Sequence, residues 1–294
     1  MLIDSNQNDV NLTSLKEPVI NLGNQIQNHG VLLVIQEPEL NILQVSRNAA
    51  YILDFTLESL LEKNLEDLLD PYQIVRIKSR LAEDSLDFTN PTKIWIKKKR
   101  EEYAVFDAVF HRNSEGILIL ELEPAISENN IPFLSFYHLA KASINKLQAS
   151  ASLQDYCQII VETVRKVTEF DRVMLYKFNE NNHGCVLAED KLESMEPYLG
   201  LNFPESDIPK PARKMFLSNL IRLIPDASEE SIDIFPQLNP ITERPIDLTN
   251  STLRSPYPCH IEYLHNMGVG ASLTISLIKE GRLWGLIACH HKTP

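Results

Sequence analysis

The chain lacks the features that mark secreted, membrane-spanning and nucleic-acid-binding proteins. Its 294 residues include only four cysteines, with no CxxC pair, which is too few for a disulfide framework. No apolar run approaches the roughly 18 residues of a membrane-spanning helix, and Met1 to Leu15 lacks the segments of a secretion signal. Lysine and arginine number 28 against 40 for aspartate and glutamate, and the net charge of -12 disfavours contact with DNA or RNA. We therefore expect a cytoplasmic protein with reduced cysteines and with no nucleic-acid or membrane partner.

What the chain does contain is typical of a globular α+β protein with two cores. Hydrophobic residues make up 44% and charged residues 23% of the sequence, which are ordinary values for folded domains. A length of 294 residues exceeds the ~100–200 residues of one domain. A polar linker follows Glu123-Pro124, so we expect an arm over residues 1–30, a first domain over 31–128 and a second over 129–294.

The pattern of the first domain predicts an antiparallel sheet with short helices on one face. Two apolar runs, 31–36 and 42–45, flank a Glu37-Pro38-Glu39 turn and predict a hairpin. Pro71 is expected to break the helical segments. The remaining elements expected here are helices within 48–69 and 74–81 and strands over 93–97, 103–110 and 116–123.

The second domain mixes helical and strand patterns. In the helix expected over 153–167, Cys157 lies on the apolar stripe and is interpreted as a core residue. The segment 225–258 is rich in proline and acidic residues and lacks periodicity, as functional loops do. The other expected elements are a helix from 133, helices over 209–217 and 258–267, and strands over 172–178, 185–189, 221–224, 271–278 and 283–289.

The register of the last hairpin decides which side chains His290 meets. The 271–278 strand alternates apolar and hydroxyl side chains, so its polar face either lines a site or is solvated. A two-residue Glu280-Gly281 turn would set His290 opposite Ala271. We favour a three-residue turn with a left-handed Gly281 and a bulge, which sets His290 opposite Ser272 and gathers polar groups on one face.

Cys259 is the best candidate nucleophile of the chain. It follows Pro258 at an expected helix start and precedes His260, and both a helix N-terminus and a neighbouring imidazolium favour a thiolate. A structural role, a zinc site with Cys289 and His290, a Cys-His hydrolase and covalent capture of a prosthetic group all remain open. Adjacent Cys-His pairs suit zinc poorly, and no motif for an oxyanion hole accompanies the cysteine.

Several motifs follow one another along the chain. In the second domain they are DRVMLYKF at 171–178, EPYLG at 196–200, PESDIP at 204–209, RSPYPCH at 254–260, NMG at 266–268 and LWGLIACHH at 283–291. In the first domain they are FD at 106–107, FHRN at 110–113 and ELEP at 121–124. Together these motifs resemble the N-terminal PAS-GAF photosensory region of cyanobacterial-type phytochromes, over nearly the whole chain.

The resemblance implies a PAS domain over 31–128 and a bilin-binding GAF domain over 129–294. It also implies a rare knot, in which Pro18 to Leu22 of the arm threads through the 225–258 loop. The last GAF helix, the PHY domain and the histidine kinase transmitter of the family are expected to be absent. We therefore expect no enzyme activity apart from autocatalytic chromophore attachment, and an impaired far-red state.

The function that the resemblance implies is that of a red/far-red photoreceptor. Cys259 matches the position at which the family forms a thioether to a linear tetrapyrrole. The arm contains no cysteine, unlike that of the biliverdin-binding branch, so phycocyanobilin is the implied cofactor. Light would isomerise the double bond between rings C and D and signal to an output kinase or response-regulator pathway, with a homodimer formed through GAF helices.

The resemblance also implies a role for each remaining site residue. Arg222 and Arg254, with Ser272 and Thr274, would bind the two propionates of the pigment. The backbone carbonyl of Asp207 and a water held by His260 would accept from the pyrrole N–H groups, and His290 would donate to the D-ring carbonyl. Tyr176, Phe203, Tyr263, Met174 and Tyr198 would enclose the rings.

A second function remains open beside the photoreceptor. A PAS-GAF regulator can bind a small ligand such as a cyclic nucleotide, or can serve for dimerisation alone. Cys259 with His260 is the feature that favours the pigment. Asn202 and Phe203 replace the usual histidine and tyrosine of the family, which affects D-ring hydrogen bonding, and Cys185 is a candidate second thiol.

Overall fold

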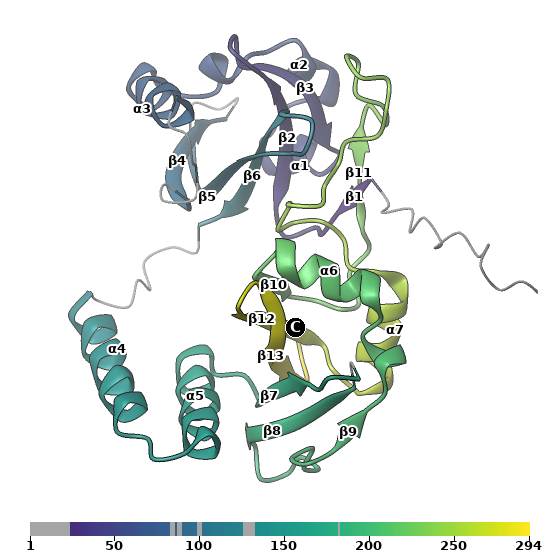
Figure 1. Cartoon of the computed structure of the whole chain (residues 1–294). Coiled ribbons are helices and arrows are strands. Elements are labelled where there is room, and N and C mark those ends of the chain that lie inside the picture. The colour runs from purple at the N-terminus through teal and green to yellow at the C-terminus, as the bar shows by residue number, and fades with distance from the viewer. Residues whose placement is uncertain (1–23, 83–85, 87–89, 99–101, 126–132, 182) are drawn as a thin grey trace, which may run out of the picture.

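The computed structural model describes residues 24–82, 86, 90–98, 102–125, 133–181 and 183–294. These residues form two antiparallel sheets, each with helices packed against it, so the expected α+β fold class is confirmed (Figure 1). No helix in this part of the chain is both long and apolar enough to cross a membrane.

The first sheet has the strand order β1-β11-β3-β2-β6-β5-β4. The expected strands are confirmed as β2 (Val31–Gln36), β3 (Asn41–Ser46), β4 (Thr92–Lys97), β5 (Tyr103–Arg112) and β6 (Leu118–Pro124). Apolar side chains of α1 (Ala49–Ile52), α2 (Leu57–Leu61), the 3-10 turn η2 (Leu65–Asp67) and α3 (Pro71–Leu81) pack on one face of the sheet. The helical segments are interrupted just before Pro71, as expected, and Pro71 itself begins α3, because the first turn does not need its missing N–H.

Two strands of this sheet come from outside the expected first domain. β1 (Gln25–Ile26) belongs to the arm, and β11 (Ile232–Phe235) belongs to the segment that the sequence pattern left as a loop. β11 pairs with both β3 and β1, and Ile234 is fully buried between them. Such short strands have no periodicity of their own and depend on distant partners. The middle of the 225–258 segment, residues 232–253, therefore packs on the first sheet (Figure 1).

The described part of the arm lies between two stretches of the 225–258 segment, β11 and the residues around Leu253. On one side β1 pairs with β11, and on the other the Gln27 N–H donates to the Leu253 carbonyl (2.8 Å). A methyl group added at Gly30 would lie 2.6 Å from Leu253 Cδ2, so glycine is required for this close approach. The residues expected to thread, Pro18 to Leu22, lie outside the described residues, and the knot stays a prediction.

The second sheet has the strand order β10-β12-β13-β7-β8-β9. Its strands are β7 (Arg172–Phe178), β8 (Gly184–Lys191), β9 (Asn202–Phe203), β10 (Ile221–Ile224), β12 (Ala271–Lys279) and β13 (Arg282–His291). α5 (Leu153–Thr168) covers one face, and Cys157 is buried there as expected. The other face carries α6 (Lys210–Ser218) and α7 (Pro258–Asn266), while α4 (Phe133–Gln148) packs on α5.

The register expected for the last hairpin is confirmed, but the turn differs from the expectation. His290 lies opposite Ser272. The turn has only two residues, Glu280 and Gly281, with φ values of 53° and 70°, which is the type I′ conformation. Leu277 pairs with Gly285 and Ile278 with Leu283, so the extra residue that shifts the register is Trp284, within β13.

The packing of the arm against the loop can be tested at Gly30 and Leu253. Gly30→Ala should lower the free energy of unfolding by about 1–3 kcal/mol through overpacking, and Leu253→Ala by about 2–5 kcal/mol through a cavity. In the double variant the new methyl group occupies space that Leu253 vacates. Denaturant unfolding should then give a double-variant loss at least about 1 kcal/mol smaller than the sum. Strict additivity would contradict the contact.

Candidate functional site

A cavity of about 510 Å³ lies between the second sheet and helices α6 and α7. β7, β12 and β13 supply its floor, and the helices and the segment around residues 203–209 supply its walls. Every residue that the family resemblance assigned to the pigment site lines this cavity: Met174, Tyr176, Tyr198, Phe203, Asp207, Arg222, Arg254, Cys259, His260, Tyr263, Ser272, Thr274 and His290. The fold thus brings together side chains that are spread over more than a third of the sequence.

Strand alternation decides which side chains reach the cavity. Ser272 and Thr274 on β12 and His290 on β13 line it, whereas Leu273 and Cys289 lie in the core on the opposite face, with α5. The set of Cys259, His260, Cys289 and His290 considered for zinc is therefore not brought together. Within the described residues no group of three or more His, Cys, Asp or Glu side chains is arranged to hold a metal ion.

Two buried arginines line the cavity and form no ion pair with a carboxylate among the residues that the structure describes. Arg222, on β10, is 7% exposed and donates to the carbonyls of Thr252 (2.9 Å) and Arg254. Arg254 is 4% exposed, and its Nε and Nη1 have no hydrogen-bond partner among the described residues. Burial, followed by repulsion from Arg254, lowers the pKa of Arg222 to about 9, so it remains a cation at neutral pH. Buried cations with unfilled donors favour an anionic ligand.

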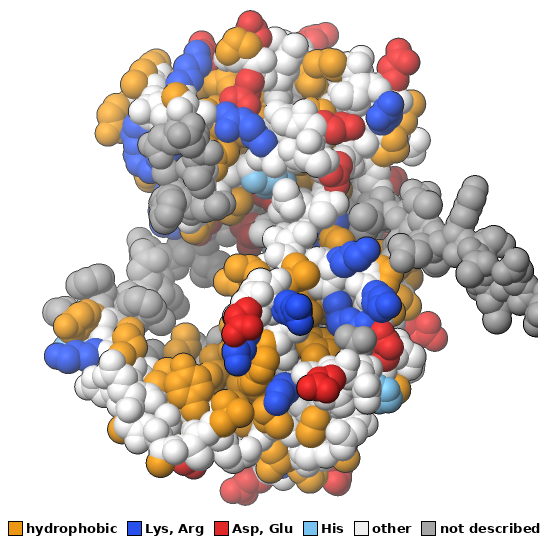
Figure 2. Space-filling model, in the orientation of Figure 1, with side chains coloured by type: hydrophobic (Ala, Val, Ile, Leu, Met, Phe, Trp, Pro, Cys, Tyr) orange, Lys and Arg blue, Asp and Glu red, His pale blue; other side chains and the backbone are white. Residues whose placement is uncertain are grey.

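The surface around the cavity carries positive charge as well. Figure 2 shows lysine and arginine side chains gathered on the face where α6 lies. That helix contributes Lys210, Arg213 and Lys214 at its first two turns. By contrast, a second cavity of about 530 Å³ behind α7 has Asp226, Glu229, Glu230 and Glu262 among its lining residues and no lysine or arginine. The cavity with Cys259 is therefore the one suited to an anion.

The two histidines of the cavity are neutral at pH 7. Burial and the nearby Arg222 lower the pKa of His260 to about 4, and burial, Arg172 and His260 lower the pKa of His290 to about 4. A neutral imidazole has one donor and one acceptor, so each ring can hold a water or a polar ligand atom. The sequence argument that an imidazolium at His260 favours the Cys259 thiolate is therefore wrong. The missing information was the burial of the ring, which depends on tertiary packing.

Cys259 is the one exposed cysteine of the four. It is the second residue of α7, after Pro258, and it lines the cavity. Cys157 and Cys289 are buried, and burial raises the pKa of both thiols, to about 12 for Cys289. Cys185, on β8, is partly exposed but does not line the cavity. Accessibility therefore favours Cys259 as the reactive thiol.

Aromatic side chains line the part of the cavity near β7 and β9, toward the other edge of the sheet from Arg222 on β10. The Tyr176 ring lies 5.9 Å from the Phe203 ring, and the Tyr198 ring lies 6.5 Å from it. The guanidinium of Arg172 lies 3.7 Å from the centre of the Tyr198 ring, which holds that side chain in place. Burial first, then Asp207, raises the pKa of Tyr176 to about 12, so it is a neutral phenol.

Sequence reasoning missed several residues that shape the cavity. Gly184 was not singled out, although a methyl group added there would lie 1.6 Å from Tyr176 Cζ. Asn219 and Tyr257 also line the cavity, as do Ala212, Met215 and Phe216 on the inner side of α6. The spacing of these last three residues, i, i+3 and i+4, is the signal that could have identified them.

Comparison with known proteins places these features in a family. The PAS fold matches residues 15–125 and the GAF domain matches residues 152–294. Cyanobacterial phytochrome A of Nostoc sp. is 67% identical over 99% of the chain, and phytochrome-like protein Cph1 of Synechocystis sp. is 54% identical over 97% of it. The chain spans 38% of the length of each of these two relatives.

Solved structures agree with this comparison. The chromophore binding domain of Stigmatella aurantiaca phytochrome P1 is 40% identical, with a TM-score of 0.86 over 92% of this chain and 88% of that one. The chromophore-binding domain of a bacteriophytochrome from R. palustris is 35% identical, with a TM-score of 0.86. Fold and site thus define a PAS-GAF protein with a ligand cavity in its GAF domain. The chain belongs to the phytochrome family.

The difference in cysteine burial predicts an order of thiol modification. A small thiol reagent should modify Cys259 first in the native chain, because the other candidates are partly or fully covered. Cys157 and Cys289 should react only after unfolding, since each is at most 1% exposed. Mass spectrometry of the modified peptides would check this order. Fast modification of Cys289 in the folded protein would contradict the placement of that side chain.

The two buried histidines predict a loss of stability in acid. Their pKa is lower in the folded than in the unfolded chain, so the unfolded state binds more protons as the pH falls from about 6.5 to about 4. Between pH 7 and pH 5 each should lower the free energy of unfolding by about 2 kcal/mol. Urea unfolding of the ligand-free protein should show a smaller loss in His260→Gln and His290→Gln, and an unchanged loss in the exposed control His265→Gln. Equal losses in all three would contradict burial of neutral imidazoles.

Proposed function

We propose that this chain binds a linear tetrapyrrole covalently in the 510 Å³ cavity and serves as a red/far-red photosensory module. The observation that carries the proposal is the pair of buried arginines, Arg222 and Arg254, which line a cavity that also contains the accessible sulfur of Cys259, with two donors of Arg254 left without a partner among the described residues. A cavity of this volume is in the range of about 300–1,000 Å³ usual for ligand sites. The relative from Stigmatella aurantiaca is itself a chromophore binding domain, which supports the proposal.

Each group of the cavity suits one part of a tetrapyrrole with two propionates. Arg222 and Arg254 are the cations for the carboxylates, and the hydroxyl groups of Ser272 and Thr274 supply further donors. The neutral His290, whose Nδ1 has no partner among the described residues, can donate to or accept from a terminal ring. His260 holds a water near the pyrrole nitrogens, where the Asp207 backbone carbonyl accepts as well.

Attachment needs only groups that the chain contains. The Cys259 thiol lies in the first turn of α7 and lines the cavity. Its sulfur would add to the ethylidene double bond of ring A, and the thiol proton would pass to the pigment, so the reaction needs no oxidant and releases no leaving group. Attachment is in this sense autocatalytic. When bound, the tetrapyrrole supplies the visible absorption and the double bond between rings C and D that light isomerises.

The surroundings of the pigment complete the proposal. Phycocyanobilin is the proposed bilin, because the arm contains no cysteine and relatives at 54–67% identity are cyanobacterial phytochromes. Tyr176, Phe203, Tyr263, Met174 and Tyr198 enclose the rings and limit their movement to the one that light drives. We place the chain in the cytoplasm, as a homodimer formed through GAF helices that signals to a kinase or response-regulator output.

Coexpression with phycocyanobilin synthesis tests this function. The wild-type chain should become blue-green, should change its absorption spectrum after red light, and should retain zinc-induced fluorescence on a denaturing gel. Cys259→Ala should lose the fluorescent band, because it lacks the attachment sulfur. Cys185→Ala is the control and should keep it. A colourless wild-type chain would overturn the proposal and favour a small-ligand or dimerisation regulator.

A further inference from the structure

Glu121 is a carboxylate buried at the contact between the two domains. On β6, Leu118, Leu120 and Leu122 pack in the core of the first sheet, so Glu121 points from the opposite face toward the 225–258 segment. Its side chain is 1% exposed. A charge at this depth is stable only when several donors surround it.

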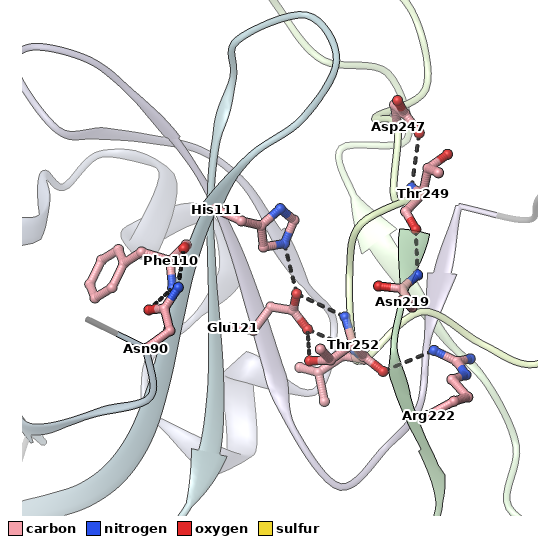
Figure 3. Close-up of polar contacts among 10 residues, drawn as sticks. Asn90, Phe110, His111, Glu121, Asn219, Arg222, Asp247, Thr249 and Thr252 are labelled. Carbon is pink, nitrogen blue, oxygen red and sulfur yellow. Dashed lines mark hydrogen bonds and ion pairs between the residues drawn. The ribbon is translucent and has the colours of Figure 1, made fainter. Parts of the chain in front are cut away.

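Four donors from two parts of the chain meet this carboxylate (Figure 3). His111 Nε2 (2.7 Å) and the Thr252 N–H (3.0 Å) bond to Oε1, and the Thr252 hydroxyl (2.7 Å) and the Leu253 N–H (2.6 Å) bond to Oε2. Burial alone raises the pKa of Glu121, but the bonds with His111, Thr252 and Leu253 outweigh it and hold the pKa below its usual value. The side chain is therefore a carboxylate that accepts hydrogen bonds from the backbone N–H groups of Thr252 and Leu253.

The same short segment contacts the arginines of the cavity. The Thr252 carbonyl accepts from Arg222 Nη1 (2.9 Å), the Arg254 carbonyl accepts from Arg222 Nη2, and Arg254 itself lines the cavity. Residues 252–254 are thus bonded to Glu121 on one side and to a cavity cation on the other (Figure 3). The Leu253 side chain is fully buried, which limits the movement of residues 252–254 between Glu121 and Arg222.

A second connection runs from the same hairpin, β5–β6, to the cavity. Ser114, in the turn between these strands, bonds to Asp247 (2.7 Å), which accepts from the Thr249 N–H (2.9 Å). The Thr249 carbonyl accepts from Asn219 Nδ2 (2.6 Å), and Asn219 lines the cavity. The hairpin of the first domain therefore holds the 247–254 segment at two points, each of which continues to a cavity residue. Figure 3 shows the parts of these connections that run from Asp247 to Asn219 and from Glu121 to Arg222.

We propose that Glu121 is a positioning residue for the ligand's carboxylates: it fixes residues 252–254 and thereby aims Arg222 and Arg254 into the cavity. The proposal rests on the proposed function. Glutamine at 121 has a similar shape but only one acceptor oxygen. Whichever way its amide is turned, either the Thr252 or the Leu253 N–H loses its acceptor. The segment that carries the arginines then loses its anchor, although no residue of the cavity is changed.

The test compares two forms of the pigment on Glu121→Gln and wild-type chains. One probe is phycocyanobilin, with both propionates free, and the other is its dimethyl ester, in which neither carboxyl group can be charged. If Glu121 acts through the arginines, Glu121→Gln should slow covalent assembly of the free acid roughly tenfold and that of the diester less than twofold. A general loss of packing would slow both probes equally. The readout is the growth of bound-pigment absorbance after mixing.

Matched variants complete the experiment. Glu123→Gln, on the same face of β6 but 41% exposed at its side chain and outside the network, should assemble like wild type. Glu121→Asp keeps the charge and should give an intermediate rate with the free acid, and it replaces Glu121→Gln if circular dichroism shows that the latter is unfolded. A wild-type chain that takes up neither probe would overturn the proposed function and this inference with it. Normal free-acid assembly of folded Glu121 variants, or equal slowing with both probes, would overturn this inference alone.

Discussion

Two buried guanidinium groups without an ion-pair partner among the described residues set the charge of the cavity. Arg222 and Arg254 are buried, repel each other, and form no ion pair within the described part of the chain. Removing such charges from water is costly, and a partner that supplies negative charge recovers much of that cost. A ligand with two carboxylates satisfies this condition, whereas a neutral or cationic ligand would leave both cations unmet. The tyrosines, the neutral histidines and the sulfur of Cys259 then select among anions.

The arginines are held by both domains, although only one domain lines the cavity. Among the described residues none before Met174 lines the cavity, so the described part of the first domain contributes no side chain to the wall. It contributes instead through β3 and Glu121, which together with the arm fix the 225–258 segment at β11 and at residues 252–253. This arrangement gives a physical reason for the two domains to remain together. The sheet that holds the loop therefore supports the site, although none of its described residues before Met174 lines the cavity.

Much of this could be predicted from the sequence, and the exceptions share a cause. The alternation on β12 and β13 predicted that Ser272 and His290 lie opposite each other on one face, and the motifs identified residues that line one cavity. β1 and β11 were not predicted, because strands of two and four residues depend on partners that are remote in sequence. We expected the bulge in the turn, but it lies at Trp284 within β13. Rules for turns describe only the turn residues, and not how a side chain further along the strand packs. The charge of His260 and the importance of Glu121 follow from burial, which no local pattern encodes.

A crystal structure of the chain after incubation with phycocyanobilin would show whether the buried arginines bind the carboxylates of the pigment. We expect continuous density from Cys259 Sγ into the cavity, with propionate oxygens within hydrogen-bonding distance of Arg222 and Arg254 and with residues 252–254 still bonded to Glu121. Pigment bound elsewhere, or bound in the cavity with its carboxylates directed away from both arginines, would contradict this expectation.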